Sequence, residues 1–298
     1  MNILFDKNIN LFANKSDLEI IKKLPSYKKY YKPIFIQYIE ELHFDIQYIE
    51  SIHIIHNKPS YGTTKHNIKD GQIYFTIELS DDIIPYVSNV QNSTDTFKAK
   101  SIVQHEICHC IEIKQLYHSN ALNTENPLNE NFQINTTYNF LYSEAVNIWS
   151  EFFACYHNRK MNKWHECPNV EDDLIQLNKW ISAIKYYLNG HKDVQLCEDM
   201  LKFLHNFWYH MVSLIAVHLH NHENILIADY ENTEYDYIAQ FFEYIYQCLK
   251  SNLDFYPAWL SEDGYINLGK SLMMILELNK IIFSTDDLSD NFIFKAIQ

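Results

Sequence analysis

The stretch "SIVQHEICHCIEI" (residues 101–113) lies in the middle of the chain and decides the fold around it. In this stretch and on both sides of it, apolar, histidine and glutamate residues recur at steps of three and four, which is the period of one helix face. They are Phe97, Ile102, Val103, His105, Glu106, His109, Ile113 and Leu116. We therefore expect a single helix over about residues 95–118.

At the centre of this helix, His105-Glu106-Ile107-Cys108-His109 matches the pattern H-E-x-x-H. His105 and His109 are four residues apart, so their imidazoles project from one helix face and can share a metal ion. Glu106 lies beside them, where its carboxylate can take a proton from a water that the metal activates. The alternative is a helix that carries two histidines by coincidence. A strong predicted strand before the helix, and the mid-helix position of the pattern, favour the metal site.

Such a site needs a third protein ligand. A metzincin would continue with Gly at position 112 and His at position 115, but these residues are Glu112 and Gln115. His118 lies about 13.5 Å beyond His109 along the helix, too far to share the ion. The next predicted helix, about 137–159, offers Glu144 and Glu151, whose Cα atoms are about 10.5 Å apart along the axis. Only one of them can reach the metal.

The segment Glu151-Phe152-Phe153-Ala154 resembles the E-x-x-A of the glutamate helix in gluzincin metallopeptidases. The resemblance covers about residues 45–160. It implies that zinc is held by His105, His109 and Glu151, with Glu106 as the general base. Glu144 stays open as the alternative third ligand.

The same resemblance makes three further points. Many gluzincins have Asp or Asn directly after that alanine, whereas this chain has Cys155. The strand before the motif helix, here within residues 72–80, is expected to form the upper rim of the cleft and to pair with an extended peptide. A Tyr or His that stabilises the oxyanion is also expected. The nearby candidates are Tyr142, Tyr156 and His157.

Elsewhere the sequence predicts an α+β fold that is predominantly helical. We expect helices from about 17 to just before Pro25 and over 32–43, 137–159, 170–189, 194–221, 233–251 and 267–280. Strands are expected through 52–56 and 72–80, separated by a turn-like stretch at 57–71, in a sheet of two to four strands. A zincin-like core is predicted over 1–160 and a helical region over 161–298.

Composition excludes several classes of function. The formal net charge is −14 and no dense Lys/Arg cluster offsets it, so we expect no nucleic-acid partner. The six cysteines form no C-x-x-C pair, which indicates reduced thiols and a cytoplasmic location. The N-terminal residues lack a Sec-type signal pattern. Residues 203–222 carry no Asp, Glu, Lys or Arg, but their histidines and asparagines favour a core helix over a membrane span.

Together these features predict a zinc metallopeptidase that hydrolyses a peptide bond in a protein or peptide substrate, with no membrane partner. Two alternatives stay open. One is a catalytically inactive, zincin-like protein that binds the metal, and the other is a purely helical interaction module without metal. In either case the helical C-terminal half is a candidate for binding a protein partner.

Overall fold

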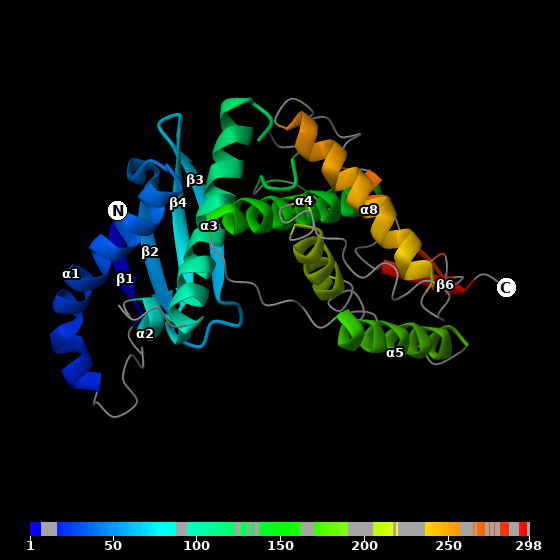
Figure 1. The fold of residues 1–298 in the computed structure, drawn as a ribbon, viewed down its shortest axis with the longest axis horizontal. Coiled ribbons are helices and arrows are strands. Elements are labelled where there is room, and N and C mark those ends of the chain that lie inside the picture. The colour runs from blue at the N-terminus through cyan, green and yellow to red at the C-terminus, as the bar shows by residue number, and fades with distance from the viewer. Residues whose placement is uncertain are drawn as a thin grey trace. The chain divides into compact units, whose positions relative to one another are not determined.

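The computed structural model describes residues 1–6, 17–87, 94–122, 126–129, 131, 133, 137–161, 170–189, 205–216, 219, 236–256, 265, 267–271, 274, 277, 281–285 and 292–296. The fold is mixed α+β, mostly helical, with one four-stranded sheet (Figure 1). The chain divides into two compact units, Met1–Tyr117 with His157–His165, and His118–Tyr156 with Glu166–Gln298.

The first unit contains four strands and three α-helices within the described residues. They are β1 (Asn2–Phe5), α1 (Asp17–Glu41), β2 (Ile49–Ile55), β3 (Gly62–Lys69), β4 (Gln72–Ser80), α2 (Ile84–Val87) and α3 (Thr94–His118), with 3₁₀ turns at Ile46–Tyr48 and Asp81–Ile83. Strands β2 and β4 confirm the two predicted strands, and α3 confirms the helix predicted to carry the motif.

The sheet has the strand order β1-β2-β4-β3, so β4 is internal. Strands β1, β2 and β4 run parallel, and β3 runs antiparallel to β4. One face of the sheet is apolar because alternate side chains of β4 are buried, among them Phe75 and Ile77. Polar and charged side chains, such as Lys65 and Glu78, pair on the opposite face. The sheet therefore buries one face, and α3 lies along it (Figure 1).

Polar contacts near its start and near its end hold α3 in place within this unit. Near its start, Lys100 and Gln104 bond to the Glu41 carboxylate at the end of α1, at 2.5 and 3.1 Å. Near its end, Tyr117 donates a 2.7 Å hydrogen bond to the carbonyl of Gly71 in the β3–β4 turn. These bonds fix both the position and the rotation of the helix, and hence the direction of its motif side chains.

Two expectations for the first unit are wrong. Helix α1 does not stop before Pro25 but continues through it and through Pro33 to Glu41. Beyond the prolines, burial of side chains such as Phe35 and Ile39 stabilises the helix, and tertiary packing overrides the local penalty. The turn-like stretch 57–71 contains strand β3. Its polar sequence, GTTKHNIK, is typical of an edge strand, which pairs with another strand on one side only and is open to solvent on the other.

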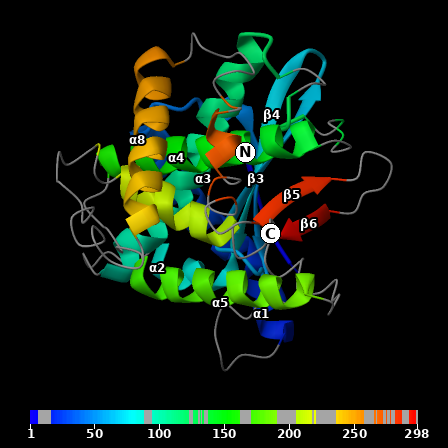
Figure 2. The same ribbon diagram turned by 90° about the vertical axis from the view of Figure 1, so that its right-hand side faces the viewer.

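The second unit contains most of α4 (Thr137–Met161), α5 (Val170–Leu188), α8 (Asp236–Phe255) and the antiparallel pair β5 (Ile281–Thr285) and β6 (Phe292–Ala296), which Figure 2 shows. The three helices were predicted. The two strands were not, because the segment beyond residue 160 was expected to be helical throughout. "IIFST" and "FIFKA" are nonetheless rich in the β-branched and aromatic residues that favour strands.

Large aromatic side chains form the core of this unit. Trp208 and Phe241 are fully buried, and their ring centroids are 4.7 Å apart. Trp208 belongs to the helical residues 205–216. Together with residue 219, they are the described part of the helix predicted over 194–221. Within the described ranges, the structure has no helix with the length and apolar character needed to cross a membrane.

The apolar face of the sheet predicts a large effect of truncating Phe75. The side chain is 0% exposed and contacts the Phe44 ring at a centroid distance of 6.0 Å. We expect Phe75→Ala to lower the free energy of unfolding by about 3–5 kcal/mol, measured by urea denaturation. Ile68→Ala is the control, since Ile68 on β3 is 49% exposed, and it should change stability little. Ile68 and Phe75 lie on the same face of the sheet, so equal losses in both variants would contradict the difference in burial between them.

Candidate metal site

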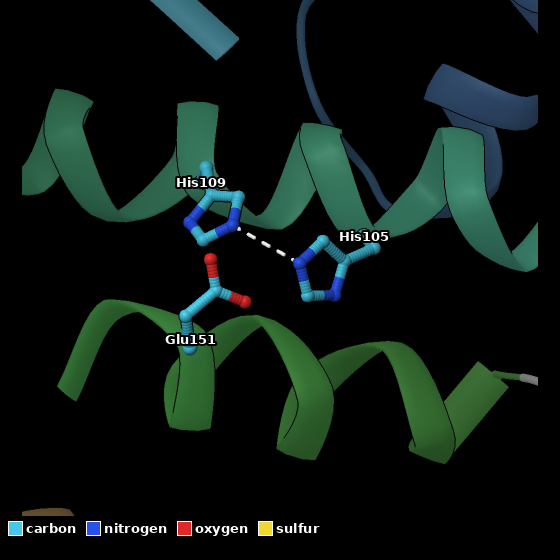
Figure 3. A group of neighbouring side chains, drawn as sticks. All are labelled: His105, His109 and Glu151. Atoms are coloured by element: carbon cyan, nitrogen blue, oxygen red, sulfur yellow. Dashed lines mark hydrogen bonds between the residues drawn. The ribbon is translucent and has the colours of Figure 1, made fainter. Parts of the chain in front are cut away.

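The two motif histidines converge on one side of α3. The Nε2 atoms of His105 and His109 are 3.1 Å apart, and their rings are nearly perpendicular, at 83° (Figure 3). Both side chains are half-buried. The helical spacing of four residues thus produces the convergence that the sequence predicts.

A carboxylate from α4 completes a group of three. His105, His109 and Glu151 each offer one ligand atom, and these atoms all lie within 4.8 Å of one another. Figure 3 shows the three side chains pointing toward a common space. Among the residues that the structure describes, this is the group of His, Cys, Asp and Glu side chains arranged to hold a metal ion. Their role as ligands stays a prediction.

The donor atoms fit a zinc ion. Two imidazoles and one carboxylate are a donor set of catalytic zinc sites, which keep a fourth position for water or substrate. Two nitrogens that each lie about 2.0–2.1 Å from a tetrahedral zinc are about 3.3 Å apart. The observed separation of 3.1 Å between the histidine Nε2 atoms is close to this value, so the two imidazoles need little movement to bind the ion.

The alternative ligand Glu144 has a different neighbour. Its Oε2 lies 3.7 Å from Nδ1 of His205, a residue that sequence reasoning did not single out. Interaction with the Glu144 carboxylate raises the pKa of His205, and the charge of Glu151 adds to this effect. Glu144 is not part of the three-residue group.

A pair of hydrogen bonds joins the last turns of α4 to α3. The Asn158 side-chain amide donates to the carbonyl oxygen of Ser101 at 3.0 Å and contacts its Oγ at 2.8 Å. Ser101 lies one turn before His105 in α3. These bonds fix the position of the C-terminal end of α4 on the motif helix.

The predicted general base, Glu106, is buried, with 6% of its surface exposed. Thr64 of β3 donates toward it from Oγ1, which lies 2.9 Å from Oε2 and 2.8 Å from the backbone carbonyl oxygen of Glu106. The sequence reasoning missed Thr64 because residues 57–71 were assigned to a turn. The two adjacent β-branched residues Thr63 and Thr64, a type that favours strands, are a local signal that could have found it.

The position of β4 corrects one expectation from the resemblance. Residues 72–80 were expected to present a free edge at the rim of the site, but β4 pairs with β2 on one side and β3 on the other. The antiparallel strand β3 is the edge strand on this side of the described sheet. The prediction chose β4 because it is the last strand before the motif helix in sequence. In the sheet, however, β3 lies outside β4 and forms the edge.

The cysteines near the motif are buried. Burial raises the pKa of the Cys110 thiol well above its usual value, and the negative charge of Glu106 raises it further. The raised pKa disfavours the thiolate, which is the nucleophilic form of cysteine. Cys155, which follows the E-x-x-A segment, is a buried free thiol.

The three oxyanion candidates differ in their surroundings. Tyr142 is buried, with its ring 5.7 Å from that of Tyr265. Tyr156 stacks on Phe152 at 5.9 Å. His157 is half-buried in the last turns of α4. Their proposed role stays a prediction.

No known family model matches the chain, and neither the comparison with curated proteins nor the comparison with solved structures found a match. The gluzincin resemblance therefore depends on the residues quoted above and stays a prediction.

The three-residue group predicts which substitutions weaken metal binding. We expect His105→Ala, His109→Ala and Glu151→Ala each to weaken zinc binding by more than the roughly 10–100-fold that the loss of a ligand's supporting partner costs. Zinc affinity would be measured by competition with a chelator of known affinity. Glu144→Ala, on the same helix as Glu151, is the matched control and should bind like the wild type. The reverse result for the two glutamates would assign the third ligand to Glu144.

Proposed function

We propose that this protein is a zinc-dependent metallopeptidase of the gluzincin type, with a zincin-like arrangement of sheet, motif helix and glutamate helix. The observation that carries the proposal is the convergence of His105, His109 and Glu151 within 4.8 Å. A carboxylate suited to proton transfer, Glu106, follows the first histidine directly. Together these four residues supply what metal-assisted hydrolysis needs from the protein: ligands and a base.

His105, His109 and Glu151 would hold the ion. When bound, zinc polarises the scissile carbonyl and lowers the pKa of a coordinated water to about 7. Glu106 accepts a proton from the attacking water and passes it to the departing amine, so that the peptide bond breaks without a charged leaving group. Burial of Glu106 keeps its carboxylate in one place for both proton transfers.

Strand β3 is the element best suited to hold an extended peptide. Its outer edge carries backbone N–H and C=O groups that β4 does not use, and an incoming strand can pair with them. Thr64 on this strand contacts Glu106, so a peptide paired with β3 would lie beside the proposed base. The substrate class is therefore a protein or peptide in an extended conformation.

Buried free thiols support the proposed cytoplasmic location. Cys110 and Cys155 are both buried and free of disulfide bonds. Such thiols persist in a reducing compartment. The net charge of −14 supports the absence of a nucleic-acid partner.

The decisive variant is Glu106→Gln, which keeps the shape of the side chain but removes its ability to accept a proton. We expect kcat for cleavage of an unstructured protein such as casein to fall by about 10²–10⁴-fold. Zinc content should stay at the wild-type level, since Glu106 is not a proposed ligand. Glu50→Gln is the control, because Glu50 pairs with Lys69 on the polar face of the sheet.

Three results would contradict the proposal in different ways. Full activity of Glu106→Gln would remove the proposed base. Zinc binding by the wild type without cleavage of any unstructured substrate would indicate a catalytically inactive, zincin-like protein. Purified protein without zinc, and unable to take it up, would favour the helical interaction module.

A further inference from the structure

The proposed base is enclosed by β3, a strand that the sequence pattern did not predict. Thr64 and Gly62 are two residues apart on β3, so both lie on the face of the sheet that α3 covers. In the register of the sheet they pair with Ile77 and Leu79, whose side chains are fully buried. Their position faces Glu106 from directly across the helix–sheet interface.

Gly62 leaves the space that the Glu106 side chain occupies. A β-carbon built on Gly62 would lie 2.7 Å from both Cγ and Cδ of Glu106, and closer still to Oε1. Cβ atoms essentially never approach other heavy atoms to within 3.0 Å. Gly62 is not one of the residues with positive φ, so its backbone conformation does not require glycine. The close approach of the Glu106 side chain is what requires glycine at this position.

The backbone at Gly62 is itself held in place. Its carbonyl oxygen accepts hydrogen bonds from Ser60 Oγ at 2.9 Å and Thr63 Oγ1 at 2.6 Å. The Lys58 ammonium group donates to both of these hydroxyls, at 2.9 and 2.7 Å. These hydrogen bonds hold the backbone at the start of β3 in one position, and the buried carboxylate of Glu106 packs against it.

We propose that Gly62 and Thr64 are positioning residues for Glu106, Gly62 by leaving space for one carboxylate oxygen and Thr64 by hydrogen-bonding the other. This inference rests on the proposed function, in which Glu106 is the base. It assigns a role to the start of β3 beyond peptide pairing: this segment sets the direction of the Glu106 carboxylate. A base that must meet one water molecule and one leaving amine gains most from such an orientation.

The hydroxyl of Thr64 suits a group that gains and loses a proton. It has one proton to donate and two lone pairs to accept with. It can donate to Oε2 when Glu106 is ionised. When Glu106 carries the proton, Oε2–H can donate to Thr64, while Thr64 donates to the backbone carbonyl oxygen 2.8 Å away. Glu106 therefore keeps a hydrogen-bond partner in both states.

The test compares Gly62→Ala, Thr64→Val and Thr64→Ser in full-length, zinc-loaded protein. In Gly62→Ala the clash is with the end of a flexible side chain, so the fold should survive and the carboxylate should move. A misplacement of about 1 Å can cost about 100-fold in rate, so we expect kcat to fall by about that factor. KM, zinc affinity and the unfolding midpoint should stay near their wild-type values.

The threonine variants separate the hydroxyl from the shape of the side chain. We expect Thr64→Val to lower kcat by about tenfold, the conventional scale for losing one positioning hydrogen bond, and Thr64→Ser to restore it. Thr76→Val is the matched control, since the Thr76 hydroxyl lies in the same sheet but contacts Ser51 at 3.2 Å instead of Glu106. Its kcat should equal that of the wild type.

A crystal structure of Gly62→Ala supplies a readout that does not depend on activity. The expected result is a displaced Glu106 carboxylate, and an unmoved carboxylate overturns the positioning role alone. A raised KM with unchanged kcat in the β3 variants also overturns it, because β3 would then act on substrate binding. Wild-type protein without peptidase activity, or an active Glu106→Gln, overturns the proposed function instead, which separates the two failures.

Discussion

A carboxylate buried between a helix and a sheet is the constraint on which the rest of this structure depends. Burying such a group without hydrogen-bond partners costs several kcal/mol, so the fold has to supply a donor and a space of the right shape. Thr64 supplies the donor and Gly62 the space. Both requirements fix the register of β3 on β4 and the rotation of α3, because a shift of one residue in the strand would turn both positions to the other face.

The burial of Glu106 against the sheet also means that different faces of α3 have different roles. Val103, Ile107 and Cys110 are fully buried and contribute to the core. His105 and His109 lie on a second side, half-buried, where their nitrogens are available to an ion. Because these faces belong to one rigid helix, packing of the apolar face on the sheet also fixes the direction in which the two histidine side chains point. The orientation of the two histidines of the candidate metal site is thus a consequence of core packing.

Local patterns predicted much of the first unit and part of the second. The alternation in β4 and the three- and four-residue steps in α3 are short-range signals, and the structure has both elements close to the predicted bounds. Strand β3 escaped prediction because an edge strand tolerates polar residues on both faces. The passage of α1 through Pro25 also escaped, since burial farther along the helix outweighs the local effect of proline.

By itself, the sequence determined that two histidines and a glutamate lie on a helix at the spacing of a metal site. Helical periodicity depends only on residues a few positions apart, so no tertiary information was needed. Only the tertiary structure decided that Glu151, and not Glu144, approaches the histidines, and that β3 encloses the proposed base. These choices depend on contacts between residues about 40 positions apart, such as Thr64 and Glu106, which no local pattern encodes.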